Sequence, residues 1–185
     1  MKSIIRMKQS FKTCLLIWYK KRKDTHQNTP IHLNLTDKGL GISSVLVILP
    51  NSWPEIRLIE HFFKSLFDDN KKIRVKYCCQ QQFASNLDER FRSNLTTYSQ
   101  VDCDRFGFPL AGFIKQIFIQ KYDAVIDLNF GYNIFSSWLT RKSDAPIRIG
   151  FNSDFADDFY NIVLDKSETS LIEKGFNNIQ KVLGI

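Results

Sequence analysis

Polar side chains lie at the carboxyl ends of three apolar runs that have the composition of buried β-strands. The runs are 44–50, 122–129 and 146–151. In an open parallel sheet, ligands bind outside the carboxyl ends of the strands, so polar residues at those positions are the first place to look for a site. The candidate ligand-binding residues are Asn51, Ser52, Asp127, Asn129, Arg148 and Asn152.

Asp127 carries the clearest chemistry of this set. A carboxylate at the end of a strand can act as a general base or accept a hydrogen bond from a substrate hydroxyl. The alternative is that Asp127 caps a neighbouring turn or pairs with Arg148. Asn51 and Asn129 have turn chemistry as their alternative, and Ser52 has the spacing of a helix cap. No residue of the set is assigned as catalytic.

Several other kinds of site are disfavoured by the motifs. The one G-x-G, at 39–41, precedes the first apolar run instead of following it, and the turn after that run has no glycine to let a pyrophosphate approach. Acidic residues cluster at two places, Asp102 with Asp104, and Asp154 with Asp157 and Asp158. The second cluster has weak potential as a cation site, but its sequence D-F-A-D-D lacks the glycine and the distal glutamate of a calcium loop. Solvated acidic loops are predicted at both places, with no metal and no cofactor.

The net charge of +7 comes from the first 23 residues. This segment holds eight of the 26 basic residues and no acidic one, which leaves 18 basic against 19 acidic side chains elsewhere. Its apolar residues share one face of a helical wheel, so residues 1–23 are predicted to form a basic amphipathic helix. Such a helix either packs on the domain or docks on an anionic membrane surface. The membrane-contact candidates are Lys2, Arg6, Phe11, Leu15, Trp18 and Lys20.

The location expected from the sequence is cytoplasmic, with peripheral attachment to the inner membrane as the further option. The apolar run at 13–19 is too short for a membrane span, and four lysines and arginines follow it directly. The four cysteines show no C-x-x-C spacing, and free thiols in a reducing compartment are predicted. Because the rest of the chain is nearly neutral, nucleic acid is a disfavoured partner.

Strand and helix patterns alternate from residue 44 to the end. The sequence predicts an α/β fold: a Rossmann-like open, mostly parallel sheet of about six strands, with helices on both faces. Residues 24–43 are predicted to link the N-terminal helix to this domain at 44–185. Strands are expected at 44–50, 73–79, 96–101, 122–129, 146–151 and 160–165, and helices at 53–68, 80–95, 109–120, 134–139 and near the C-terminus.

Residues 121–161 also carry a family resemblance. K-Y-D-A-V-I-D-L-N, S-S-W-L-T-R-K-S-D-A-P, I-R-I-G-F and F-Y-N follow one another in this stretch. The series resembles the N-terminal half of bacterial lipopolysaccharide heptosyltransferases, glycosyltransferase family 9. The resemblance implies one half of a two-domain GT-B arrangement, in which the N-terminal domain mainly holds the acceptor and the C-terminal domain holds the nucleotide sugar.

Two departures from that family bear on activity. The family has Gly-Asp after its first strand, and this aspartate is the expected catalytic base. The present chain has Pro50-Asn51-Ser52 there, so no carboxylate carries over. The chain also ends at Ile185, about where the donor-binding domain of the family would begin.

The function predicted from these observations is a binding or interaction module that is non-catalytic alone, with enzymatic activity left open. The alternative is an acceptor-binding component of a glycosyltransferase in cell-envelope glycan synthesis, which would obtain its donor half from a partner chain.

Overall fold

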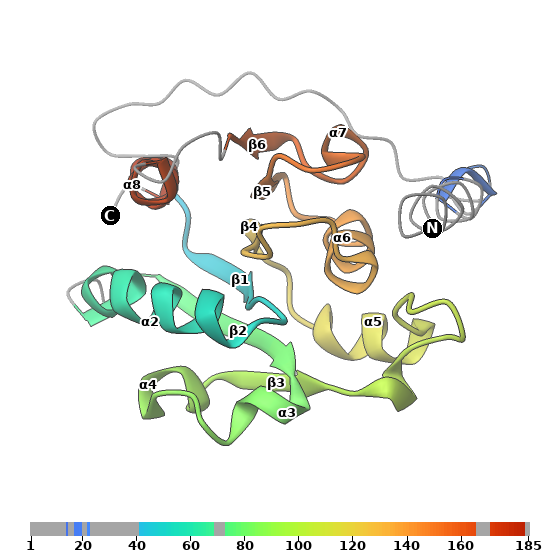
Figure 1. Cartoon of the computed structure of the whole chain (residues 1–185), viewed down its shortest axis with the longest axis horizontal. Coiled ribbons are helices and arrows are strands. Elements are labelled where there is room, and N and C mark those ends of the chain that lie inside the picture. The colour runs from blue at the N-terminus through green and yellow to red at the C-terminus, as the bar shows by residue number, and fades with distance from the viewer. Residues whose placement is uncertain are drawn as a thin grey trace, which may run out of the picture.

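The fold is a six-stranded, all-parallel sheet with helices on both faces, seen in a computed structural model of the chain (Figure 1). The structure describes residues 14, 17–19, 22, 41–68, 73–165 and 171–183. The predicted linker and most of the predicted N-terminal helix lie outside these residues. Within these ranges no helix has the length and apolarity to cross a membrane.

The strand order is β3-β2-β1-β4-β5-β6, so the chain builds the sheet outward from its centre in two directions. The strands are β1 (Ser44–Ile48), β2 (Arg74–Gln80), β3 (Leu95–Tyr98), β4 (Ala124–Asp127), β5 (Ile147–Phe151) and β6 (Ile162–Leu164). The reversal of direction falls between β1 and β4, which pair in parallel. A crevice at this point is where open α/β sheets bind their ligands.

The helices connect successive strands and cover the sheet. They are α2 (Trp53–Asp68), α3 (Gln81–Ala84), α4 (Glu89–Arg92), η1 (Gln100–Asp102), α5 (Ala111–Ile117), α6 (Ile134–Arg141), α7 (Ala156–Phe159) and α8 (Leu171–Leu183). The helix predicted at 80–95 is two short helices, and the helix predicted at 109–120 is shorter at both ends. The segment around Asp157 and Asp158, predicted to be an acidic loop, contains α7.

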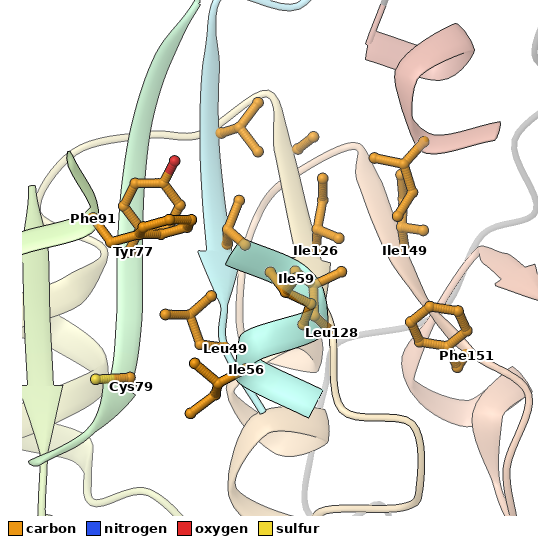
Figure 2. Packing of buried hydrophobic residues seen from close by; sticks show 14 of the residues in the cluster. Leu49, Ile56, Ile59, Tyr77, Cys79, Phe91, Ile126, Leu128, Ile149 and Phe151 are labelled. Atoms are coloured by element: carbon orange, nitrogen blue, oxygen red, sulfur yellow. The ribbon is translucent and has the colours of Figure 1, made fainter. Parts of the chain in front are cut away.

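Two hydrophobic layers hold the helices on the sheet. On one face, Ile56 and Ile59 of α2 pack on the buried side chains of β1, β2 and β4, as Figure 2 shows. On the other face, α5 and α6 pack on Leu46 and Val125. The side chains of β1 and β4 alternate between these layers, and every residue of both strands is buried. Their near-continuous apolar sequence is what a strand covered on both faces requires.

A third cluster joins the N-terminal segment to the domain. Ile17 is 2% exposed and packs in a cluster with Trp138 of α6 and Phe159 of α7. Its neighbours Trp18 and Tyr19 are more than half exposed. A helical wheel puts Trp18 and Tyr19 on the apolar face of the predicted helix, whereas the described part of this segment packs through Ile17.

Candidate functional site

Asn51, Asp127 and Asn129 come together at the carboxyl ends of β1 and β4, as the sequence predicted. The backbone N–H of Asn51 donates to Oδ1 of Asn129 at 3.2 Å. The Asn129 amide nitrogen donates to Oδ1 of Asp127 at 2.7 Å and to the Ser136 hydroxyl at 3.1 Å. These contacts use the acceptor and both donors of the Asn129 amide. The crevice between β1 and β4 is therefore bridged by protein groups.

Tyr160 completes the bonding of Asp127. Its hydroxyl donates to Oδ2 of Asp127 at 2.7 Å, while the backbone N–H of Asn129 donates to Oδ1 at 3.0 Å. The Tyr160 oxygen also lies 2.9 Å from the Ser137 hydroxyl. Because Tyr160 has a single proton and gives it to Asp127, Ser137 donates in this pair. Both carboxylate oxygens of Asp127 are thus occupied by the protein.

Gly150 in β5 makes this position of Tyr160 feasible. A Cβ atom built on Gly150 would lie 2.5 Å from Cε2 and Cζ of the Tyr160 ring. The ring therefore lies directly across the β5 backbone, which only glycine leaves open. The sequence pattern places Tyr160 at the start of a strand and does not indicate this contact. The signal that could have found it is a glycine inside a buried strand, which often marks close approach of another group.

Tyr98 extends the network to the other side of β1. Its hydroxyl donates to Oδ1 of Asn51 at 2.8 Å, and its ring stacks on Phe135 of α6 with a centroid separation of 3.8 Å. The polar groups therefore run in one chain of contacts from Tyr98 through Asn51, Asn129 and Asp127 to Tyr160. We call these five residues the carboxyl-edge network. Its three central members are among the candidates predicted from the sequence, and the two tyrosines at its ends are not.

Burial dominates the electrostatics of the network. Asp127 is 1% exposed, and its pKa is raised above 3.8 because burial disfavours the charged form, although hydrogen bonds from neighbouring side chains oppose the shift. Burial and then the charge of Asp127 raise the pKa of Tyr160 well above 10. A general base must come within hydrogen-bond reach of its substrate. In this structure the oxygens of Asp127 face protein donors instead.

The other three candidates do not join the network. Ser52 lies just before α2, and its carbonyl oxygen accepts from the N–H of Ile56 at 2.9 Å, as a residue at the cap position does. Asn152 follows β5 and is exposed. Arg148 lies across from Val125 in the register of β4 and β5. None of these three residues forms a hydrogen bond with Asp127.

The predicted alternative that Asp127 pairs with Arg148 is wrong, and the alternative that it caps a turn is confirmed by its bond to the N–H of Asn129. Arg148 is 5% exposed, and burial, followed by the charge of Arg141, lowers its pKa. Its Nε has no hydrogen-bond partner. The reason is register: Arg148 is paired two residues before the level of Asp127, and Tyr160 occupies the space beside the carboxylate.

The cysteines are free, as predicted. Cys78 and Cys79 are buried, whereas Cys14 and Cys103 are half-buried. Burial raises the pKa of Cys79 to about 12. In the described part of the chain, no group of three or more His, Cys, Asp or Glu side chains has the arrangement of a metal site. Of the membrane-contact candidates, only Trp18 lies among the described residues.

Comparison with known proteins identifies both a family and a fold. Residues 12–185 match the model described as "Family of unknown function (DUF6913)". No curated protein shows a significant match. A solved glycosyl transferase family 9 protein from Veillonella parvula superposes with a TM-score of 0.61 at 17% identity, over 80% of this chain and 43% of its own. E. coli heptosyltransferase WaaC with ADP-2-deoxy-2-fluoro heptose superposes with a TM-score of 0.54 at 17% identity, over 76% of this chain and 48% of its own.

The chain spans less than half the length of each of these two structures. At this identity the likeness shows the fold. It confirms the predicted resemblance to glycosyltransferase family 9 and the Rossmann-like, parallel α/β sheet.

Proposed function

The chain belongs to the family of unknown function DUF6913, and from this premise we propose that it is a glycosyltransferase-like domain that acts as a non-catalytic binding or interaction module. The observation that carries the proposal is the carboxyl-edge network. At the place where a catalytic carboxylate would be expected, this chain has Asn51, and its side chain accepts a hydrogen bond from Tyr98.

Asp127 is the carboxyl group of the carboxyl-edge network, and its surroundings favour a structural role. Both of its oxygens accept hydrogen bonds from within the domain, and it is 1% exposed. To take a proton from a substrate, it would have to lose these contacts. The hydrogen bonds of a buried carboxyl group are costly to break, at roughly 1–3 kcal/mol each.

The test is a search for donor binding and turnover. We expect no heat of binding with ADP-2-deoxy-2-fluoro heptose by calorimetry, and no release of ADP from ADP-heptose. The matched variant is Asp127→Asn, which keeps the shape of the side chain. Turnover by the wild-type protein that disappears in this variant would refute a non-catalytic role.

The acceptor-binding component of a glycosyltransferase in cell-envelope glycan synthesis is the second candidate. The observation that favours it is that the two similar structures are glycosyltransferases of which this chain covers less than half. This candidate requires a partner chain that supplies the donor half. Calorimetry with the nucleotide sugar should then show binding when this chain and its partner are mixed. Absence of binding in every such mixture would exclude it.

Peripheral attachment of a cytoplasmic protein to the inner face of a membrane, through residues 1–23, is a further part of the proposal. Ile17 anchors the segment on the domain, while Trp18 is 56% and Tyr19 is 53% exposed. Tryptophan and tyrosine favour the membrane interface, and basic residues favour anionic lipid. Sedimentation with phosphatidylserine liposomes should show binding that Trp18→Ser weakens. Ile119→Ser, at an exposed apolar residue of the domain, is the control, and equal binding by both variants would contradict the role of Trp18.

A further inference from the structure

A basic hollow lies at the amino edge of the sheet, at the opposite end from the carboxyl-edge network. Its volume is about 430 Å³, and three cations, Arg74, Lys76 and Lys121, contribute to its lining. The amides of Asn94 and Gln120 line it as well, and none of the described residues that line it is acidic. Pockets of this size hold small molecules.

The shortness of α5 explains why the hollow exists. Arg74 and Lys76 are two residues apart on β2, so their side chains project on the same face of the sheet. This is the face that α5 covers. A seven-residue helix rises roughly 10 Å, whereas a seven-residue strand extends roughly 23 Å. The first residues of β2 are therefore left uncovered, and the connection from α5 to β4, with Lys121, forms an opposite wall.

The placement of these cations also differs from the sequence-based expectation. The alternation of basic and apolar residues at 73–79 is typical of a strand near an edge of a sheet. In the structure, β2 is paired on both sides, with β1 and with β3. Arg74 is exposed and Lys76 half-buried because the helix layer ends above them.

The charge of the hollow is uncompensated within the described part of the chain. The side chains of Arg74, Lys76 and Lys121 form no ion pair or hydrogen bond with a described residue, and Lys121 accepts from the Ser44 hydroxyl only through its backbone carbonyl oxygen. Asp123 lies two residues after Lys121, but its Oδ2 already accepts from the backbone N–H groups and hydroxyls of Ser43 and Ser44, at 2.8 to 3.1 Å. Oδ2 of Asp123 is therefore occupied by the residues at which β1 begins.

We propose that this hollow, which we call the amino-edge site, binds a phosphate-bearing ligand through Arg74, Lys76 and Lys121. A guanidinium and two ammonium groups match the several oxygens of a phosphate, and the neighbouring amides supply further donors. The proposal deepens the binding role proposed above, since it gives that role a site and a ligand class. It also moves the expected site from the carboxyl edge to the amino edge.

Calorimetry with inorganic pyrophosphate tests the site directly. The wild-type protein should bind it with an affinity that falls as salt is added, because the contacts are charged. Each of Arg74→Gln and Lys121→Gln should weaken binding by about tenfold, the effect of losing one charge-assisted contact. Arg105→Gln is the matched control, because Arg105 is an exposed arginine in the connection that leaves the carboxyl end of β3. It should leave binding unchanged.

A second arm identifies the source of the phosphate. Liposomes with and without phosphatidic acid are sedimented with the wild-type protein and with the same three variants. Binding of pyrophosphate alone that depends on the two cations supports a soluble ligand, and cation-dependent binding of the liposomes supports a lipid headgroup. No binding of either probe, or equal weakening by Arg105→Gln, overturns the site. Neither result depends on nucleotide-sugar turnover, which tests the proposed function separately.

Discussion

Replacing Gly150 by alanine should break the hydrogen bond between Tyr160 and Asp127, although Gly150 takes no part in that bond. The new Cβ atom would lie 2.5 Å from two carbons of the Tyr160 ring, one of which bears the hydroxyl. The ring must move outward by roughly 1 Å to reach ordinary carbon–carbon contact. The hydroxyl now lies 2.7 Å from Oδ2 of Asp127, and such a shift takes it beyond hydrogen-bond range.

The expected loss of stability has two parts. Overpacking of a core costs about 1–3 kcal/mol, and loss of a hydrogen bond to a charged acceptor costs about 1.5–3 kcal/mol. Alanine offsets about 0.4–1 kcal/mol of this loss, because it lowers the conformational entropy of the unfolded chain. At the centre of these ranges, the net decrease in the free energy of unfolding should be about 3–4 kcal/mol. Proteins of ordinary stability remain folded after such a loss.

Urea unfolding, followed by circular dichroism, measures this decrease. The matched control is Gly112→Ala in α5, where a Cβ atom has no neighbour within 4 Å. Because alanine favours a helix over glycine, this control should be neutral or stabilising by up to about 1 kcal/mol.

A double-mutant cycle with Tyr160→Phe separates the hydrogen bond from the packing. Removing the hydroxyl should cost about 1.5–3 kcal/mol in the wild-type background and almost nothing beside Ala at position 150, where the bond is already lost. Equal costs in the two backgrounds would refute the reasoning. So would a Gly150→Ala variant as stable as the Gly112→Ala control.

Three further predictions concern ionisable groups. The pKa of Asp127 is raised above 3.8 by burial, so the contribution of this carboxyl group to stability falls as pH rises through the raised pKa. Urea unfolding measured from about pH 4 to pH 7 should therefore show the wild-type protein losing stability relative to the Asp127→Asn variant. The pKa of Asp123 is lowered below 3.8, chiefly by the backbone N–H of Ser43, so its contribution is present above 3.8 and lost as pH falls through the lowered pKa. Asp123→Asn should therefore cost on the order of 1 kcal/mol at neutral pH, and a difference that persists in strong acid would contradict this. Cys78 and Cys79, buried and with raised pKa values, should react with a thiol reagent only as fast as the protein unfolds, whereas rapid labelling of the native protein would show that they are accessible.

The main elements of the fold could be predicted because their signals are local. The apolar run at 44–50 and the alternation of helices and strands indicated a parallel sheet, and β1, α2 and β4 lie where the patterns placed them. Short elements were predicted less well. The helix at 81–84 and the helix at 89–92 were merged in one prediction, and α7 was missed. Helices of four residues have too little periodicity to register as a pattern.

The candidate site was predicted in part for the same reason. Asn51, Asp127 and Asn129 follow neighbouring strands, and the carboxyl ends of parallel strands meet at one edge. Their partners Tyr98 and Tyr160 come from distant parts of the chain, and no local pattern indicates such contacts. The sequence also directed attention to the carboxyl edge alone. The hollow at the amino edge depends on where α5 ends relative to β2, which periodicity places only to within a few residues.

The most direct test of the central claim follows the carboxyl carbon resonance of Asp127 through a pH titration, with and without ADP-2-deoxy-2-fluoro heptose. If the carboxyl-edge network is a closed structural feature, the pKa of Asp127 will be above 3.8 and the same in both titrations. A pKa of Asp127 that moves when the nucleotide sugar is added would show a carboxylate that responds to the ligand and would contradict the account.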